Sequence, residues 1–271
     1  MWCAEMNSVA SSKKYRLGIA LGGGGAKGFA HLGVLRAMED FGLNPDIVAG
    51  CSAGSVVGAF YCAGYTSDEI LNSFSTFSLR SILKVTMPTT GLFSLSKVEK
   101  FIESRLPYSR IEDLPTPMVV TATSLDDCTS VAFREGELSK TVVASCSLPM
   151  IFQPTIIDGK TYVDGGVLHN LPVFALRECC DYVIGVVVSP LDTSPFKNTL
   201  ADIGYRSYRL MTTHNTYKDM QLCDEVISVD SMKGKGTFGF DAMKENAKEG
   251  YFAAMKVMVN SPLLKQLRDD K

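Results

Sequence analysis

The 271-residue chain has almost no net charge, no long apolar run and no Cys-x-x-Cys pair. Its 27 Lys and Arg residues nearly balance 29 Asp and Glu residues, which argues against nucleic acid as a partner. The longest apolar stretch, 182–188, is far shorter than the roughly 20 residues of a membrane span, so any membrane contact should be peripheral. The eight cysteines are scattered without metal-ligand spacing, which predicts free, mostly buried thiols in a reducing compartment and no structural zinc.

The first residues, 1–14, are small and polar and have neither a continuous apolar core nor a cleavage site, so they do not resemble a secretory signal. We expect them to form a frayed tail. Hydrophobic residues make up 46% of the chain, which is enough for a sizeable buried core. We therefore expect residues 15–271 to fold as a single domain and the protein to be cytoplasmic.

Strand-like and helix-like patterns alternate along the chain. An apolar strand runs into four glycines and a helix with apolar residues at helical spacing, and a second short strand precedes a helix of small residues. This order predicts an α/β fold with a mostly parallel sheet sandwiched between helices. We expect helices at 29–40, 52–64, 138–145, 198–222 and 244–259, strands at 15–21, 46–49, 118–124, 128–133, 182–188 and 225–229, and a hairpin at 155–163. The last helix is amphipathic and should pack on the core.

Gly50-Cys51-Ser52-Ala53-Gly54 fits the Gly-x-Ser-x-Gly pattern, in which a serine sits on a sharp turn between a strand and a helix. Small neighbours let the turn bend without clashes, and the hydroxyl projects away from the backbone. The pattern alone is weak in a chain with 23 glycines, but here an apolar strand precedes it and a helix follows it. This context predicts that Ser52 is a nucleophile and that Gly50 and Gly54 form its elbow.

A second glycine-rich turn, Gly22 to Gly28, follows the first strand. Its glycines let backbone amides face an anion, either a dinucleotide pyrophosphate or the oxyanion of an acyl-transfer intermediate. Gly23, Gly25 and Gly28 match the dinucleotide pattern Gly-x-Gly-x-x-Gly. That function needs an acidic residue at the end of the second strand to hold a ribose, whereas Asp46 precedes this strand. The oxyanion interpretation is favoured, and both turns should meet at the carboxyl edge of the sheet.

A nucleophilic serine needs a base, and the sequence offers few histidines. His31, His169 and His214 are the three imidazoles, and none has a compelling sequence context. His169 follows Asp164 closely and could complete a Ser-His-Asp triad. Asp164 itself follows a predicted strand and precedes Gly165-Gly166, a turn that would let its carboxylate approach another loop. A carboxylate can take a serine proton only in a dry site that raises its basicity, because an ordinary Asp titrates at about 3.9.

Three separated motifs together resemble those of the patatin-like phospholipases and acyl hydrolases. They are Gly23-Gly24-Gly25-Ala26-Lys27-Gly28, the Gly-x-Ser-x-Gly motif at 50–54, and Asp164-Gly165-Gly166. Ser147-Leu148-Pro149 and Asn170-Leu171-Pro172 are also similar to the family's surroundings of the aspartate. The likeness spans about 15–190 of the chain.

The resemblance implies a Ser-Asp dyad that hydrolyses fatty-acyl esters of phospholipids or other lipids through an acyl-enzyme. It makes Ser52 the nucleophile and Asp164 the base, with no metal and no cofactor. The fold it implies is a mostly parallel sheet between helices. The supporting assignments that it implies are oxyanion-hole amides at Gly23, Gly24 and Gly25, loop support from Lys27 and Gly28, elbow glycines at Gly50 and Gly54, and a proton-acceptor motif at Gly165 and Gly166.

The segment 84–96 breaks the alternation of strands and helices. Its apolar residues Met87, Leu92 and Phe93 follow no period, which predicts an exposed or mobile loop. We expect these side chains to pack back on the core, or else to lie near the acyl entrance and touch a lipid surface. The expected partner is a lipid or acyl-ester substrate, and the sequence leaves the oligomeric state open.

Overall fold

A central sheet organises the chain in the computed structural model, which describes residues 14–75, 84–85, 93–236 and 240–270. Its strands are β1 (Tyr15–Leu21), β2 (Ile47–Cys51), β5 (Met118–Ser124), β6 (Thr129–Phe133), β7 (Thr155–Ile157), β8 (Lys160–Asp164), β9 (Cys180–Val187) and β10 (Glu225–Ser228). Their order across the sheet is β10-β9-β1-β2-β5-β8-β7, and β6 pairs with β5. β10, β9, β1, β2 and β5 run parallel, whereas β6, β8 and β7 add antiparallel pairs. The predicted mostly parallel sheet is confirmed.

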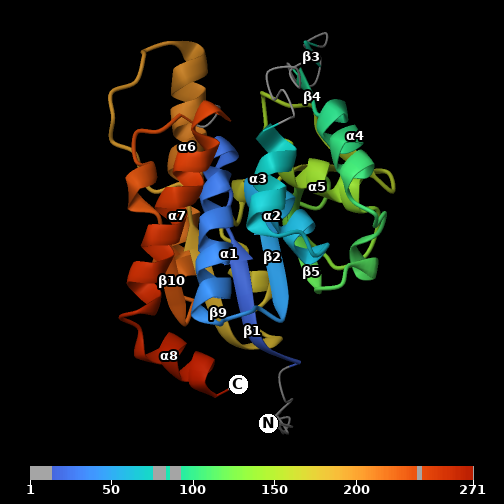
Figure 1. Ribbon diagram of the computed structural model, residues 1–271. Coiled ribbons are helices and arrows are strands. Elements are labelled where there is room, and N and C mark those ends of the chain that lie inside the picture. The colour runs from blue at the N-terminus through green and yellow to red at the C-terminus, as the bar shows by residue number, and fades with distance from the viewer. Residues whose placement is uncertain (1–13, 76–83, 86–92, 237–239, 271) are drawn as a thin grey trace, which may run out of the picture.

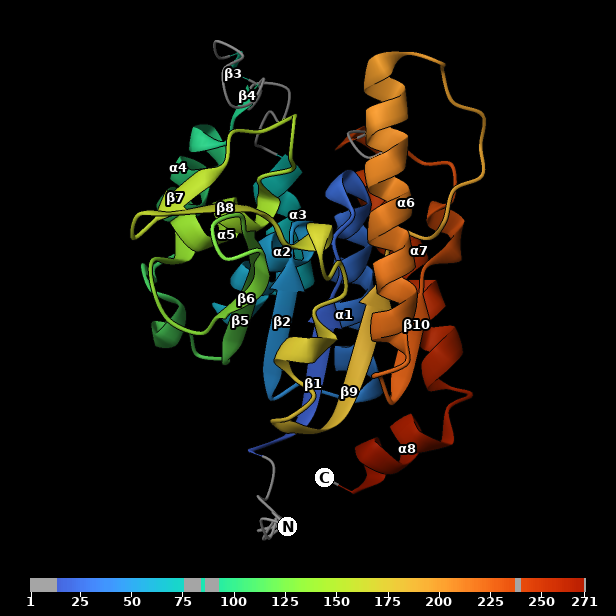
Figure 2. The same cartoon turned by 180° about the vertical axis from the view of Figure 1, so that it is seen from behind.

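Helices cover both faces of this sheet. They are α1 (Ala30–Phe41), α2 (Ala53–Cys62), α3 (Ser67–Ser75), α4 (Ser96–Arg105), α5 (Leu138–Cys146), α6 (Leu200–Met220), α7 (Met243–Met258) and α8 (Pro262–Asp269). Figure 1 shows α1, α2 and α7 in front of the sheet. Figure 2 shows α6 and the yellow segment 165–179 on the opposite face. This arrangement confirms the predicted sandwich of a sheet between helices.

The parallel strands bring their carboxyl ends to one end of the molecule. β2 and β5 are buried along their whole length, as expected for parallel strands that are covered on both faces. The arrowheads of β2 and β9 point toward the end of the molecule to which α6 extends, away from α8 (Figure 2). The two glycine-rich turns follow β1 and β2 at this edge, where ligands of parallel sheets bind.

Helices α1 and α7 are in backbone contact through two glycines. A Cβ on Gly33 of α1 would lie 1.8 Å from the carbonyl oxygen of Ala247 in α7, and one on Gly250 of α7 would lie 1.9 Å from the carbonyl oxygen of Ala30. Two helix backbones come this near only where the facing positions have no side chain. Met258 near the end of α7 is fully buried, so this helix packs on the core as its amphipathic pattern predicts.

Some elements differ from those that the sequence predicted. Helices α3, α4 and α8 lie in segments where the pattern indicated none. The predicted loop at 84–96 ends in β4 (Phe93–Ser94), which pairs with β3 (Lys84–Val85). Phe93 is half-buried and also bridges to Phe152, so it packs against the protein. Met87 and Leu92 lie outside the described residues.

Two expectations from composition can be compared with the structure. Seven cysteines lie in the described part of the chain and all are free thiols, as predicted. Cys51, Cys62 and Cys180 are buried, whereas Cys128 is exposed in the turn between β5 and β6. Among the described residues, no helix combines the length and the apolar character that crossing a membrane requires.

Candidate active site

Ser52 lies at the sharp turn between β2 and α2. Its backbone adopts φ 51° and ψ −123°, a conformation that costs a non-glycine residue roughly 1–3 kcal/mol. The elbow glycines allow the turn to pack tightly, because a Cβ on Gly54 would lie 2.1 Å from the carbonyl oxygen of Leu21. A Cβ on Gly50 would lie 2.5 Å from the Cα atom of Ser55. The strained turn holds the Ser52 hydroxyl clear of the backbone at the carboxyl edge of the sheet.

Asp164 lies at the end of β8 and faces Ser52. The Ser52 Oγ atom donates a hydrogen bond of 2.6 Å to Asp164 Oδ2. The other carboxylate oxygen, Oδ1, accepts a 2.8 Å bond from the Gly166 amide, and the nearby Tyr208 hydroxyl also favours the charged carboxylate. The fold thus brings together two predicted site residues that lie 112 positions apart in the sequence.

Burial controls the protonation of Asp164, which is only 3% exposed. Removal from water raises the pKa of this carboxyl from 3.8 to about 6, because burial disfavours the charged form. The hydrogen bonds from Ser52 and Gly166, together with the nearby Tyr208 hydroxyl, favour the carboxylate and limit the rise of its pKa. At neutral pH the group is therefore ionised, yet it is more basic than an ordinary aspartate.

Helix α5 positions both residues of this pair through two buried serines. The Ser52 amide donates a 2.8 Å bond to Ser145 Oγ, which itself donates a 2.7 Å bond to the carbonyl of Thr121 in β5. The Asp164 amide donates a 3.0 Å bond to the carbonyl of Ser147, just after α5. Ser147 belongs to the stretch that resembles the family's surroundings of the aspartate, whereas nothing in the sequence marked Ser145.

The glycine-rich turn at the end of β1 lies beside Ser52. The Gly23 amide donates a 3.0 Å bond to the carbonyl of Asn170, so this predicted anion donor is already satisfied within the fold. Gly24 and Gly25 line the same pocket as Ser52. Over the described ranges of the chain, their amides donate no hydrogen bond. Two amides of the turn therefore remain available to an anion.

His31 supports this turn, although its sequence context gave no indication of a role. The ring is fully buried, and burial lowers the pKa of His31 to about 4, so the imidazole is neutral. Its Nε2 atom lies 2.7 Å from the carbonyl oxygen of Gly22, which can only accept, so Nε2 carries the proton and donates. On the other side, a Cβ on Gly28 would lie 2.5 Å from the Cβ of Ala53, so the turn packs directly on the start of α2.

The geometry gives no support to a Ser-His-Asp triad. The ring of His31 is held by Gly22, as described. His169 Nδ1 lies 2.8 Å from Asp219 Oδ1, and His214 is exposed on α6. None of these three rings, all within the described residues, hydrogen-bonds Ser52 or Asp164.

The alternative prediction, a dinucleotide site, needs an acidic residue at the carboxyl edge of the sheet, and β2 supplies none there. The Asp46 carboxylate accepts a 2.8 Å bond from the Leu17 amide, at the start of β1 and β2 and therefore at the opposite end of the sheet. The end of β2, where the ribose ligand would be needed, leads into Ser52. The glycine turn and the serine elbow thus share one pocket with no ribose-binding acid from β2.

The pocket that holds these groups is small, at about 70 Å³, and α6 forms one side of it. Ligand sites for drug-sized molecules are larger, at roughly 300–1,000 Å³, so this space suits a reacting ester group rather than a whole lipid. Its walls are formed by Gly24, Gly25, Ser52, Cys146, Leu148, Phe152, Asp164, Asn170, Tyr205, Tyr208, Arg209 and Thr212. The last four come from α6, which the sequence predicted as a helix but did not connect with the site.

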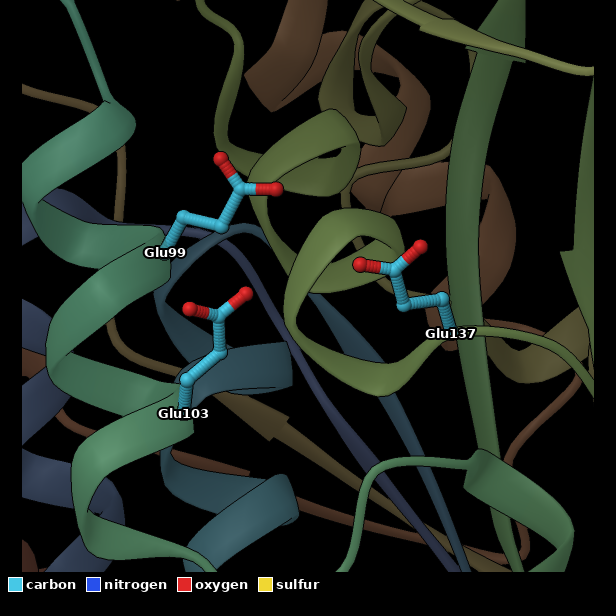
Figure 3. Close-up of side chains that lie close together, drawn as sticks. All are labelled: Glu99, Glu103 and Glu137. Carbon is cyan, nitrogen blue, oxygen red and sulfur yellow. The ribbon is translucent and has the colours of Figure 1, made fainter.

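Three carboxylates gather elsewhere in the fold. Glu99 and Glu103 of α4 and Glu137 at the start of α5 point toward one another (Figure 3), with their oxygens within 4.8 Å. Burial raises the pKa of Glu99, and the two neighbouring carboxylates add to the rise. Exposed acidic groups often gather without an ion, and this cluster shares no element with Ser52 or Asp164. We assign it no part in the chemistry of the pocket.

A comparison with protein-family models shows to which family the chain belongs. The model for patatin-like phospholipases matches residues 19–177, which is more than half of the sequence. The chain belongs to the patatin-like phospholipase family. The family match includes the glycine turn, the serine elbow and Asp164, and it ends before α6, so the helix that covers the pocket lies outside it.

Two curated proteins are similar to most of this chain. The chain is 32% identical over 194 residues to an uncharacterized NTE family protein of Mycobacterium tuberculosis, across 70% of this chain and 54% of that protein. It is 31% identical over 183 residues to lysophospholipase NTE1 of Saccharomyces cerevisiae, across 65% of this chain and 11% of that protein. The chain thus spans about half the length of the first curated relatives it matches, and far less of the yeast protein.

A solved structure has the same patatin-like fold. VipD from Legionella pneumophila superposes with a TM-score of 0.57 over 92% of this chain and 67% of that one. The sequence identity is only 14%, so the likeness concerns the fold alone.

Proposed function

We propose that this member of the patatin-like family is a metal-independent lipid acyl hydrolase that uses a Ser52–Asp164 dyad. The observation that carries the proposal is the 2.6 Å hydrogen bond from Ser52 Oγ to the buried Asp164 carboxylate. The unoccupied amides of Gly24 and Gly25 in the same pocket support it. The yeast relative is named a lysophospholipase, which favours lipid esters as the substrate class.

The chemistry follows from these positions. Ser52 Oγ attacks the acyl carbonyl carbon while its proton passes to Asp164 Oδ2, and the amides of Gly24 and Gly25 bind the resulting oxyanion. The carbon–oxygen ester bond then breaks, and the leaving alcohol takes the proton from Asp164. Water attacks the acyl-enzyme, with Asp164 again accepting the proton, and the fatty acid leaves as Ser52 regains its hydrogen.

A carboxylate can replace histidine here because its environment changes its basicity. A general base works best when its pKa lies near the operating pH. Burial brings the pKa of Asp164 to about 6, which is close to that of a histidine. The same burial keeps bulk water from competing for the proton of Ser52.

A serine-directed fluorophosphonate should label wild-type protein at Ser52, because only an activated hydroxyl attacks this reagent readily. We expect Ser52→Ala to lose both the label and the hydrolysis of a p-nitrophenyl acyl ester. Peptide mass spectrometry locates the label. The control is Ser207→Ala, an exposed serine on α6, which should keep both. Labelling that persists in Ser52→Ala would overturn the assignment of the nucleophile.

The kcat of ester hydrolysis should rise with pH through about 6 and then level off. Asp164 must be ionised to accept a proton, and its pKa of about 6 means that it is protonated and inactive below that value. A profile of kcat against pH from 4 to 8 with a soluble ester measures this limb. A rising limb centred near pH 4 would contradict the raised pKa of Asp164, because an ordinary aspartate titrates at about 3.9.

A further inference from the structure

A second, larger cavity adjoins the Ser52 pocket. It measures about 410 Å³ and lies between α6 and the segments 191–197 and 234–236. Tyr205 and Arg209 of α6 line both spaces, so the two cavities share a wall. The small pocket has room for an ester group, and this neighbouring space is where the rest of a bound molecule could extend.

The lining of the second cavity carries an excess of positive charge, even though Lys235 is paired with Glu245 at 3.3 Å. Five basic side chains line it, against two carboxylates. The basic residues are Lys27, Lys197, Arg206, Arg209 and Lys235, and the acids are Asp192 and Asp202. An excess of positive charge in a partly enclosed space attracts anions, because low-dielectric walls focus the field.

Lys27 contributes a mostly buried charge that has no direct hydrogen-bond or ion-pair partner in the described part of the chain, although the Asp192 carboxylate lies nearby. It is only 2% exposed, yet its ammonium makes no hydrogen bond or ion pair within the described residues. Burial and the nearby Arg209 guanidinium lower the pKa of Lys27 to about 8, which the Asp192 carboxylate offsets only in part. A buried cation of this kind is stabilised when an anion enters beside it.

Arg206 and Arg209 differ in how strongly their guanidinium groups are already hydrogen-bonded within the fold. Arg206 donates to the carbonyl oxygens of Asp192 and Ser194, and its guanidinium lies 5.1 Å from the centre of the Phe196 ring, so it holds the 191–197 segment in place. Arg209 reaches the carbonyls of Ser189 and Pro190 only at 3.3 and 3.5 Å. Such long bonds are weak, so Arg209 keeps most of its donor capacity for a ligand.

We propose that this cavity is an anion subsite that binds the phosphate of a glycerophospholipid substrate, with Arg209 and Lys27 as its main ligands. The inference rests on the proposed function and names the residues that would bind the headgroup, of which Arg209 lies outside the family match. A glycerol phosphate places its phosphate only a few bonds from the acyl ester, which matches two cavities that share a wall. Arg and Lys supply the charge-assisted hydrogen bonds that phosphates favour.

The test compares 1-oleoyl-lysophosphatidic acid with 1-oleoylglycerol, which carries the same acyl ester and lacks the phosphate. We expect wild-type protein to have the higher kcat/KM for the phosphate-bearing substrate. Arg209→Gln should reduce that preference by about tenfold or more, because one charge-assisted contact is lost. The matched control is Lys218→Gln, which removes a charge from an exposed position of the same helix and should leave the preference unchanged.

Conservative replacement and product analogues separate binding from folding. Arg209→Lys keeps the charge and should retain part of the preference. In wild-type protein, glycerol 3-phosphate should inhibit the hydrolysis of 1-oleoylglycerol, and Arg209→Gln should weaken that inhibition by a similar factor. If Arg209→Gln does not fold, two measurements still test the subsite. Absence of inhibition of wild-type protein by glycerol 3-phosphate, together with an unchanged substrate preference in Arg209→Lys, would overturn it.

The remaining outcomes are distinct. An equal loss of kcat/KM for both substrates in Arg209→Gln would mean that the arginine has only a structural role. Inhibition by inorganic phosphate combined with an unchanged substrate preference would assign the cavity to free phosphate and overturn the headgroup assignment. Full hydrolysis of both substrates by Ser52→Ala would instead refute the proposed function itself.

Discussion

Asp164→Asn should reduce the kcat of acyl-ester hydrolysis by about 10³-fold or more, because an amide cannot accept the serine proton. The replacement has nearly the same shape as aspartate. Its oxygen can still accept the bond that the Gly166 amide donates to Oδ1 at 2.8 Å. The loss of activity would therefore come from the missing base rather than from a displaced Ser52. Steady-state kinetics with a soluble acyl ester at pH 8 measure it.

The same variant should unfold at a higher temperature than wild-type protein at pH 8. The pKa of Asp164 is raised from 3.8 to about 6 in the folded protein, so folding favours the protonated carboxyl. The stability that this protonated form contributes is lost as the pH rises through 6. One pKa unit corresponds to about 1.4 kcal/mol, so the buried carboxylate costs the fold up to about 3 kcal/mol at pH 8. Asn removes this cost. The gain should shrink as the pH falls from 6 toward 4, where wild-type Asp164 becomes protonated.

The control for the predicted loss of activity in Asp164→Asn is His169→Ala. Its ring contacts Asp219 and not the Ser52–Asp164 pair, so the variant should keep most of its activity. Complete loss of activity in His169→Ala would restore the triad. Near-normal turnover in Asp164→Asn would show that the carboxylate is not the base.

The α/β core could be predicted because parallel strands have a clear local signal. β1, β2 and β9 are buried on both faces and read as continuous apolar runs between glycines and amphipathic helices. Helix α4 gave no such signal, since only Phe101 and Ile102 among its residues are buried. Helix α8 did carry a start signal, because Ser261 caps it and Pro262 is its first residue.

The motifs marked residues that the fold brings together, but they did not predict how those residues are held. Ser52 and Asp164 were found from their motifs, but their 2.6 Å contact depends on the sheet order β2-β5-β8, which no local pattern specifies. His31 and Ser145 support the site through contacts that no motif marks. The His31 ring donates to the Gly22 carbonyl, and the Ser145 hydroxyl of α5 accepts a bond from the Ser52 amide. The coverage of the pocket by α6 likewise depends on tertiary packing, so the cationic cavity had no signature in the sequence.

Gly33→Ala should destabilise the protein by about 3 kcal/mol or more, although the change adds a single methyl group. The new Cβ would lie 1.8 Å from the carbonyl oxygen of Ala247 and 2.5 Å from the amide nitrogen of Tyr251. Both neighbours are backbone atoms of α7, which cannot rotate away as a side chain does. The helices α1 and α7 would have to separate, and the apolar contacts between them would loosen. A loss of this size lowers the thermal midpoint by roughly 6–12 °C in a chain of this length.

The matched control makes the same substitution where the neighbouring space is open. In Gly204→Ala on α6, the new Cβ would meet only the flexible end of Met150, at 3.7 Å. Alanine favours a helix interior over glycine by up to about 1 kcal/mol, so this variant should unfold at the same temperature as wild-type protein or slightly higher. The contrast isolates the steric term, because both changes add one methyl group to a helix. Equal midpoints for Gly33→Ala and Gly204→Ala would mean that α1 and α7 do not approach as closely as their facing glycines allow.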